Sequence, residues 1–320
     1  MRAMVCYGLS RDRSGLCFEP GWPDASRPGP GEVTVAMACA ALNYPDLLML
    51  AGGYQFAPPL PFIPGVEGSG VIIAVGDGVD LGRIGSAVIV GARFGCLAER
   101  LTIPAAATRP IPPGLDQAAA AFTVGTLTAY VSFVRRGRLV PGERVAVVGA
   151  GGGTGLAAVG VAKALGAHVI ALAGSAKLGA ALAAGADEAV PVDRAGGPLP
   201  PFGPVDLVFD PVGGAGAATL MARLRPGGRY LIIGFVAGIP DVAFDQVAAA
   251  GIELIGVRAG EQGRRDPAAG ADDLAAIDAL AAAGLRPHIG LRVPLADAGA
   301  AFAAMAGGTL TGKAVIDIDA

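Results

Sequence analysis

A glycine-rich run near the middle of the chain is the sequence feature with the clearest chemistry. The apolar run Arg144 to Val148 leads into a turn of glycines, and the turn opens into a helical pattern from about Leu156. Backbone N–H groups and the positive end of that helix would face one place, which suits a pyrophosphate. The turn residues predicted to hold it are Ala150, Gly151, Gly152, Gly153, Thr154 and Gly155. The strict G-x-G-x-x-G pattern does not fit, because counting from Gly149 puts Thr154 at the last glycine.

Roughly 20 residues after such a turn, a site that prefers NAD carries an acidic residue for the ribose 2′-hydroxyl. This chain carries Gly174, Ser175 and Lys177 there instead. A hydroxyl and an ammonium can hold a 2′-phosphate, which a carboxylate would repel. NADPH is therefore the predicted cofactor. The alternative is that Lys177 is only a solvated helix residue.

Composition excludes several classes of function. The chain has 320 residues, 53% of them hydrophobic, with 16% charged residues and a net charge of −3. Such a balance gives no basic surface for nucleic acid and no polybasic segment for a membrane, and it supplies enough apolar material for two domains. The four cysteines are scattered without a Cys-x-x-Cys pair. Residues 1–10 contain no apolar run of the signal-peptide type, so we expect a cytoplasmic protein.

The elements that position the glycine turn alternate between strand and helix. The predicted strands are Arg144 to Val148, His168 to Ala173, Val205 to Phe209, Tyr230 to Ile233 and Ile252 to Val257. The predicted helices are Leu156 to Leu165, Lys177 to Ala184 and Ala217 to Leu224, the last stopping at Pro226. This alternation predicts an α/β fold with a doubly wound parallel sheet of the Rossmann type, and the segment has room for the six strands that such a sheet commonly has.

The rest of the chain predicts a second domain. Short β-rich runs bounded by Gly and Pro occupy Val33 to Cys39, Gly70 to Val75 and Ser86 to Val90, so the first third is predicted to be mostly β. The Pro- and Ala-rich segment Pro104 to Gly114 is typical of a boundary. Near the end, Asp272 and Asp273 are expected to cap a helix that Gly284 stops. A helix from Leu295 to Met305 and a strand from Lys313 to Ile318 follow.

Several motifs, in order, resemble the zinc-free quinone oxidoreductase branch of the medium-chain dehydrogenase/reductase family. They are Asn43-Tyr44-Pro45-Asp46, Gly53-Tyr54, the run Leu60 to Val71, Leu127 to Tyr130, Phe209 to Gly214, Arg286 to Ile289 and Gly312 to Val315. The resemblance implies a GroES-like catalytic domain of residues 1–122, completed by 266–320, and a Rossmann domain of residues 123–265. Zinc-using relatives have a cysteine at Asn43 and a histidine at Val66, and no Cys or His lies between Leu97 and Ala167 to serve as third ligand. Because a catalytic zinc needs three protein ligands, no metal is predicted.

The resemblance also implies roles for individual residues. Asn43 and Asp46 would lie beside the nicotinamide, Thr128 near its ribose or carboxamide, and Phe235 on the loop after the fifth strand. Lys313 is expected among the cofactor-binding residues. In the alternative interpretations Asn43 only caps a helix and Thr128 only bonds its own turn. Some family members use a tyrosine and an arginine for the 2′-phosphate where this chain has Val192 and Gly308, and here Lys177 and Arg194 could compensate for them.

Without a metal ion as Lewis acid, hydride transfer is expected only to acceptors that delocalise the negative charge formed on oxygen. A quinone or an α,β-unsaturated carbonyl does so, and one or two hydrogen-bond donors then suffice. Tyr54 is the predicted proton donor, because a phenol of ordinary pKa about 10 donates while neutral; the alternative is that it only lines the pocket. We therefore predict an NADPH-dependent quinone reductase. The alternatives are an enoyl thioester or 2-alkenal reductase, a zinc-free alcohol dehydrogenase, and a crystallin-like protein that binds NADPH without turnover. A homodimer is predicted from the apolar edge strand at Ile252 to Val257.

Overall fold

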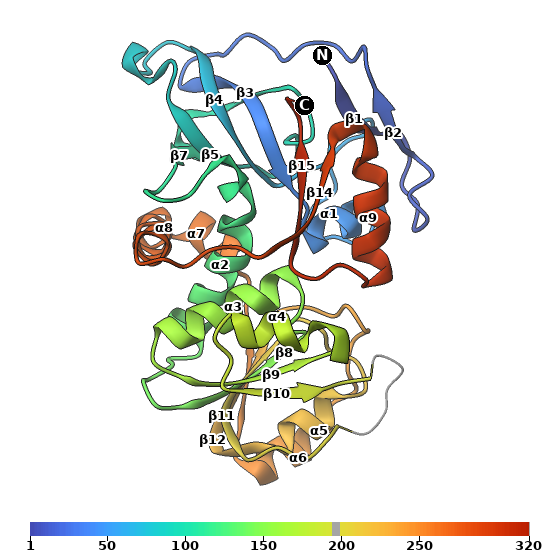
Figure 1. The fold of residues 1–320 in the computed structure, drawn as a ribbon, viewed down its shortest axis with the longest axis vertical. Helices are drawn as coiled ribbons and strands as arrows, with labels where there is room; N and C mark the ends of the chain where they lie inside the picture. The colour runs from blue at the N-terminus through green and yellow to red at the C-terminus, as the bar shows by residue number, and fades with distance from the viewer. Residues whose placement is uncertain (194–198, 320) are drawn as a thin grey trace. The chain divides into compact units, whose positions relative to one another are not determined.

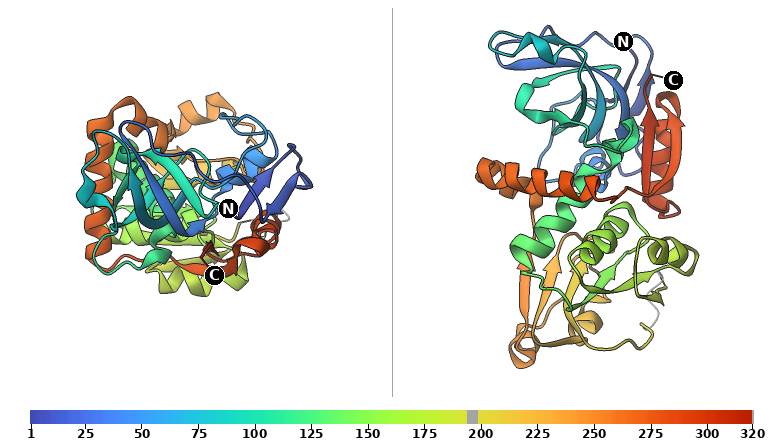
Figure 2. Two further views of the ribbon diagram at one scale, coloured as in Figure 1. Left: turned by 90° about the horizontal axis from the view of Figure 1, so that it is seen from above. Right: turned by 60° about the vertical axis from the view of Figure 1, so that its left-hand side comes forward.

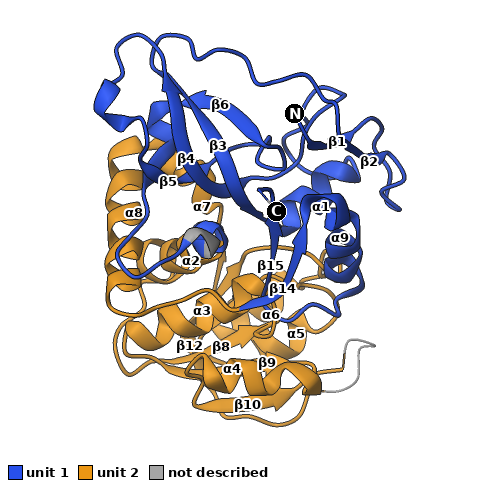
Figure 3. Ribbon diagram, turned by 45° about the horizontal axis from the view of Figure 1, so that its top comes forward, with its two compact units in different colours: residues 1–124, 289–320 blue, residues 125–288 orange. Residues whose placement is uncertain are grey.

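The chain folds as two compact units (Figure 3): unit 1 consists of residues 1–124 and 289–320, and unit 2 of residues 125–288. The computed structural model describes residues 1–193 and 199–319, including every side chain among them except those of 117 and 118. The predicted α/β class, a Rossmann sheet together with a mostly β unit, is confirmed. No helix in the described ranges is long and apolar enough to cross a membrane.

Unit 2 contains a six-stranded parallel sheet in the order β10-β9-β8-β11-β12-β13. Its strands are β8 (Arg144–Val148), β9 (His168–Ala173), β10 (Glu188–Pro191), β11 (Val205–Asp210), β12 (Leu224–Ile232) and β13 (Glu253–Gly256). Numbered along the chain, this is the order 3-2-1-4-5-6 of dinucleotide-binding sheets. The order reverses beside β8, so the residues that follow β8 and β11 lie at the usual position for a ligand.

Helices α3 (Gly153–Ala164) and α4 (Leu178–Ala183) cover one face of this sheet, and α5 (Ala217–Met221) covers the other (Figure 1). The other helical segments are α2 (Thr123–Tyr130), a π-helical turn (Val131–Arg136), α6 (Phe244–Ala250), α7 (Ala259–Arg265) and α8 (Pro267–Ala282). Alternate residues of β8 show the two layers: Val145 and Val147 pack with α3 and α4, whereas Ala146 and Val148 pack with α5. A strand buried on both faces is continuously apolar, which explains the uninterrupted hydrophobic runs of the sequence.

Unit 1 is built on a mostly antiparallel sheet around the long strand β3 (Glu32–Ala41), in which only the pair formed by the two C-terminal strands is parallel among the described residues. The other strands are β1 (Ala3–Cys6), β2 (Leu16–Glu19), β4 (Glu67–Val75), β5 (Ala87–Gly91), β6 (Arg100–Pro104), β7 (Thr108–Pro110), β14 (Ile289–Pro294) and β15 (Lys313–Asp317). The C-terminal strand β15 pairs with β3 and thereby brings the end of the chain to the N-terminal sheet. Helix α1 (Tyr44–Leu50) follows β3, and α9 (Ala298–Gly307) packs along β14 and β15 (Figure 2).

Three local expectations were wrong. The predicted helix Ala217 to Leu224 ends at Met221, because β12 begins at Leu224 and a bulge in its pairing with β11 takes up the following Pro-Gly-Gly. Asp272 and Asp273 do not cap α8; Asp266 does, accepting the N–H of Ala269 at 3.0 Å. The segment Pro104 to Gly114 is no boundary, since it contains β7, which pairs with β5 inside unit 1.

The two compact units also divide the chain differently from the predicted domain boundaries. The segment between 266 and 288, which the resemblance assigns to the first domain, belongs to unit 2. There the carboxylate of the buried Asp273, on α8, accepts a hydrogen bond from Arg135 at 2.8 Å. This ion pair, and the packing of Leu280 into the apolar layer beneath α3, hold α8 to unit 2.

Candidate functional site

The glycine turn of unit 2 has the geometry of a dinucleotide cradle. It joins the end of β8 to α3, which starts at Gly153 with Gly152 as its N-cap. Gly149 has a φ of +64°, a conformation that favours glycine. A Cβ on Gly155 would lie 2.1 Å from the carbonyl oxygen of Gly149, so the helix packs against the turn as the third glycine of the usual pattern allows. Gly155 therefore fills the role of that third glycine, although the sequence places it one residue later than the strict pattern.

The residues predicted to bind the 2′-phosphate, Gly174, Ser175 and Lys177, follow β9. Ser175 and Lys177 form a short 3₁₀ turn after Gly174, and the N–H of Lys177 donates to the Gly174 carbonyl at 2.8 Å. A Cβ on Gly151 would lie 2.5 Å from the Cβ of Lys177. The stem of Lys177 thus lies against the glycine turn, while Ser175 is exposed. Arg194 lies outside the described residues.

The loops that follow β11 and β12 lie next to the glycine turn. Val212 contacts Gly149, since a Cβ on that glycine would lie 2.9 Å from Val212 Cγ2. The carboxylate of Asp210 accepts the N–H groups of Val212 and Gly213 at 2.7 and 2.9 Å. Phe235, on the loop after β12, lies against Gly213 and is half exposed. The loop after β11 therefore links the glycine turn to the predicted cofactor residue Phe235.

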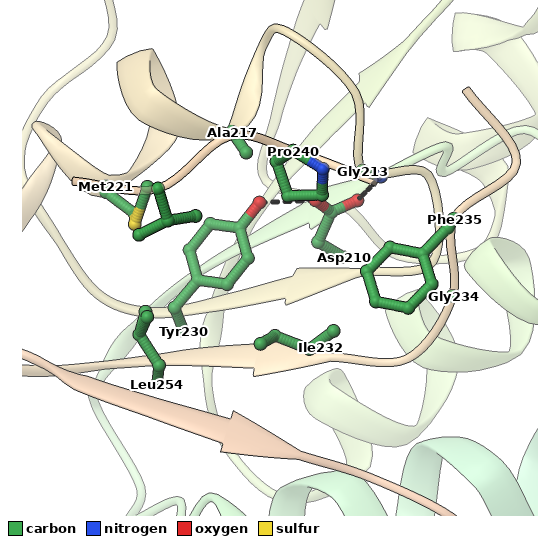
Figure 4. A pocket seen from close by; sticks show the side chains of 11 residues that line it. Asp210, Gly213, Ala217, Met221, Tyr230, Ile232, Gly234, Phe235, Pro240 and Leu254 are labelled. Atoms are coloured by element: carbon green, nitrogen blue, oxygen red, sulfur yellow. Dashed lines mark hydrogen bonds between the residues drawn. The ribbon is translucent and has the colours of Figure 1, made fainter. Parts of the chain in front are cut away.

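Beneath these loops the hydroxyl of Tyr230 donates a hydrogen bond to Asp210, and both side chains line a small, mostly apolar pocket (Figure 4). Burial, followed by the charge and hydrogen bond of Asp210, raises the pKa of Tyr230, so its phenol stays protonated. Sequence reasoning missed this pair. Asp210 is the last residue of the apolar strand β11 and lies in the motif Phe209 to Gly214. A carboxylate at the end of a strand was the signal that could have identified it.

In unit 1, four polar side chains form a buried cluster: Asn43, Asp46, Glu67 and Lys313. The Lys313 ammonium donates to Asn43 Oδ1 at 2.6 Å and to Glu67 Oε1 at 2.7 Å. Asn43 Nδ2 donates to Glu67 Oε1 at 2.9 Å and to the Ala41 carbonyl at 3.2 Å. Glu67 Oε2 accepts the N–H of Val124 at 2.8 Å. The predicted residues Asn43, Asp46 and Lys313 are therefore together, and the residue that joins them, Glu67, was not predicted.

Asp46 stands at the start of α1 and closes the cluster. One carboxylate oxygen accepts the N–H of Asn43 at 2.8 Å and the other that of Gly65 at 3.1 Å. Asn43 occupies the N-cap position, but its amide is directed to Lys313 and Glu67. Complete burial raises the pKa of Asp46 to about 7, although both N–H groups and Lys313 oppose the rise. Asp46 thus changes protonation state near neutral pH.

The donor set of unit 1 does not fit a catalytic zinc ion. Asn43 and Val66 stand where zinc-using relatives have Cys and His, and the Asn43 oxygen already faces the ammonium of Lys313. A second cation beside that ammonium would be repelled. Across residues 1–193 and 199–319, no group of three His, Cys, Asp or Glu side chains is placed to hold a metal ion.

The other two predicted residues, Tyr54 and Thr128, are not members of this hydrogen-bonded cluster. Tyr54 follows α1 and packs at the margin of the apolar core of unit 1. Its hydroxyl has no hydrogen-bond partner within the described part of the chain. Thr128 lies in α2, half buried, and its carbonyl accepts the Ser132 hydroxyl at 2.6 Å.

A dinucleotide cradle on a 3-2-1-4-5-6 sheet, in one chain with a mostly antiparallel β unit, is the arrangement of two-domain dehydrogenases. Residues 29–144 match the family described as the alcohol dehydrogenase GroES-like domain, and residues 153–276 match the one described as zinc-binding dehydrogenase. Mouse quinone oxidoreductase-like protein 2 is 32% identical over 322 residues, which cover 96% of this chain and 92% of the mouse protein. The chain therefore belongs to the medium-chain dehydrogenase/reductase family, in its quinone oxidoreductase branch.

Two further proteins are similar to this chain over most of its length. The quinone oxidoreductase from Thermus thermophilus, solved also in complex with NADPH, has a TM-score of 0.82 and 34% identity, over 99% of this chain and 100% of that chain. The human synaptic vesicle membrane protein VAT-1 homolog is 36% identical over 243 residues, which are 73% of this chain. The chain spans only about three fifths of that relative's length, the matched part being 61% of it.

Proposed function

We propose that this protein is an NADPH-dependent, zinc-free reductase of quinones or other conjugated carbonyls. The observation that carries the proposal is the replacement of a zinc donor set by the buried Asn43–Lys313 pair in unit 1, within a chain whose unit 2 has a dinucleotide cradle. The names of the quinone oxidoreductase relatives support the same acceptor class.

The residues of unit 2 fit a dinucleotide. The N–H groups of Gly153, Thr154 and Gly155 at the start of α3 would receive the pyrophosphate, because the first N–H groups of a helix have no partner within the helix. The N–H groups of Ala150 and Gly152 donate to the carbonyls of Leu172 and Gly149 at 3.0 and 2.9 Å, so these two residues would shape the turn instead. Ser175 and Lys177 would hold the 2′-phosphate, and Gly174 allows its close approach. Thr128 and Phe235 would border the nicotinamide end. When bound, the reduced nicotinamide supplies a hydride to the acceptor.

The residues of unit 1 would handle the acceptor and its proton. Reducing a conjugated carbonyl places negative charge on oxygen, which a neutral hydroxyl can stabilise by donation. Tyr54 suits this role, because its hydroxyl makes no hydrogen bond to any described residue. Asn43, Asp46 and Lys313 use their polar atoms on one another and on Glu67, so we assign them to holding α1 and the Tyr54 segment in place.

A panel of acceptors tests the proposal. Loss of NADPH absorbance would be followed with 1,4-naphthoquinone, trans-2-hexenal, crotonyl thioester and the isolated ketone cyclohexanone, each with and without EDTA. We expect turnover of at least one conjugated acceptor, little of cyclohexanone, and no effect of the chelator. Preference for the enal or thioester over the quinone would favour the double-bond reductase alternative. Tight NADPH binding without any turnover, or activity that EDTA abolishes, would overturn the proposal.

We further propose a homodimer joined through β13. This strand lies at the edge of the six-stranded sheet, and Leu254 and Ile255 on it are half buried. Ile239 and Phe244, in the segment that precedes it, are 81% and 79% exposed. An edge strand beside exposed apolar side chains can pair with its copy across a two-fold axis. Light scattering at micromolar concentration should give twice the chain mass of 31.5 kDa; the mass of one chain would refute the dimer.

A further inference from the structure

Three phenylalanines form an aromatic group in unit 1 that the proposed function leaves unused. The ring of Phe94 stacks on that of Phe56, with centroids 6.0 Å apart and planes at 27°, and meets Phe62 edge-on at 6.5 Å. Phe62 is buried, Phe56 is half buried, and Phe94 is 37% exposed. The group therefore extends from the core of unit 1 to its surface.

Arg93 covers part of this group. Its guanidinium carbon lies 3.7 Å from the centroid of the Phe56 ring, a close cation–π contact. Arg93 is exposed, and no acceptor in the described ranges bonds to it. The contact with Phe56 restrains the side chain without using its N–H donors. The five N–H groups of the Arg93 guanidinium therefore remain available to bind a ligand, while the ring contact restrains their position.

The loop that carries Arg93 is hydrogen-bonded to Gly65 and Val66, next to the predicted site residue Asp46. The N–H of Ala92 donates to the Val66 carbonyl at 2.9 Å, and that of Cys96 to the Gly65 carbonyl at 3.1 Å. The N–H of Gly65 in turn donates to Asp46. Arg93 therefore sits on a short loop directly beside Val66, the position at which zinc-using relatives have a metal ligand.

We propose that Arg93 binds a carboxylate on the acceptor, so that the preferred substrates of this protein are conjugated carbonyl compounds that carry a carboxylate. This inference rests on the proposed function, because it specifies the acceptor of the same site. A guanidinium matches a carboxylate with two parallel hydrogen bonds. One guanidinium also balances the single charge of a carboxylate, whereas a phosphate monoester carries up to two.

The test compares two acceptors with the same enone, 4-oxo-2-pentenoate and its methyl ester. The ratio of their kcat/KM values would be measured for the parent, Arg93→Gln, Arg93→Lys and Arg27→Gln. A charge-assisted hydrogen bond predicts that Arg93→Gln lowers the ratio of acid to ester about tenfold or more. Arg93→Lys should give an intermediate ratio, because it keeps the charge and loses the planar fork. Arg27→Gln removes the same charge from an exposed position of unit 1 and should leave the ratio unchanged.

A binding measurement keeps the inference separate from the proposed function. The affinity of 2-naphthoate for the protein saturated with NADP⁺, relative to neutral 2-naphthamide, would be measured by ligand-observed NMR. If no acceptor turns over, the proposed function fails, while loss of the preference for naphthoate in Arg93→Gln still supports the carboxylate site. Ratios and affinities within twofold of the parent would overturn the inference. So would a weaker NADPH affinity in Arg93→Gln with an unchanged ratio, because the anion at Arg93 would then be a cofactor phosphate.

Discussion

The ammonium of Lys313 lies 2.6 Å from the amide oxygen of Asn43, although the two residues are 270 positions apart in the chain. The contact exists because β15 pairs with β3 and brings the C-terminal strand to the start of α1. Lys313 also bonds Glu67 and is itself 5% exposed. A buried cation thus joins the first and last segments of unit 1.

Replacing Lys313 by methionine should destabilise unit 1 strongly. The substitution keeps most of the apolar stem but leaves the Glu67 carboxylate buried without its cation, and breaking such a pair typically costs about 3–5 kcal/mol. Trp22 is the only tryptophan in the sequence and belongs to unit 1, so its fluorescence in a urea titration at pH 7 reports the loss.

The double variant Lys313→Met with Glu67→Gln provides the control. Since removing both charges leaves no unpaired ion, its penalty should be smaller than the sum of the two single penalties by about 1–3 kcal/mol. Additive penalties would mean that Lys313 and Glu67 contribute independently.

The stability of unit 1 should fall as pH rises from about 4 to about 7, through Asp46. Its pKa is about 7 in the folded protein against 3.8 for a free side chain, so the unfolded chain releases this proton first. The contribution of the protonated carboxyl is complete below pH 4 and is lost as pH rises through 7. At about 1.4 kcal/mol for each pKa unit, the loss is on the order of 4 kcal/mol.

Asp46→Asn isolates this effect, because its side chain cannot ionise. The variant should be less stable than the parent at pH 5, since an amide matches the N–H groups of Asn43 and Gly65 less well. That difference should shrink or change sign by pH 8. Urea unfolding at both pH values measures it, and a difference that stayed constant or grew with pH would disprove the role of Asp46.

The preference for NADPH over NADH should depend on Lys177. Lys177→Met keeps the stem that lies against Gly151 and removes the charge. One charge-assisted contact to the 2′-phosphate predicts a weakening of NADPH binding by roughly tenfold or more. The affinity for NADH, which lacks that phosphate, is the internal control and should stay within twofold. Equal parent affinities for the two cofactors would show that Ser175 and Lys177 do not read the 2′ position.

The sequence was most informative where a local pattern alone decides the structure. β8 and β9 have the predicted bounds, because a strand buried on both faces is a continuous apolar run that ends abruptly. The glycine turn was also predicted, because its glycines lie next to one another in the sequence, directly after the apolar run of β8. By contrast, the start of β12 at Leu224 depends on a bulge against β11, a property of strand pairing that the Pro-Gly-Gly sequence does not reveal.

The buried cluster of unit 1 could not be predicted from local sequence patterns, because its members are far apart in the sequence. Asn43, Asp46 and Lys313 were each noticed through a family motif, but nothing in the sequence states that β15 lies beside β3. Glu67 was overlooked although it belongs to a quoted motif, since a single carboxylate at the start of a strand has no distinctive spacing. A buried lysine needs a partner, and only the register of the sheet identifies Glu67 as that partner.

Tyr54 is the remaining test of chemistry in unit 1, and Tyr54→Phe keeps its ring while removing only the hydroxyl. If the hydroxyl donates the proton, kcat for trans-2-hexenal should fall roughly 100-fold or more, in line with general-acid contributions. Naphthoquinone should be affected less, because the reduced quinone can take its proton from water. Tyr44→Phe is the matched control, since Tyr44 opens α1 and is also half buried in unit 1. If both acceptors keep rates within about threefold of the parent, which is less than 1 kcal/mol of barrier, the Tyr54 hydroxyl takes no part in proton transfer. In that case the proton must come from solvent. The buried cluster around Asn43 would then position Tyr54 as part of the acceptor-binding surface and not as a proton donor.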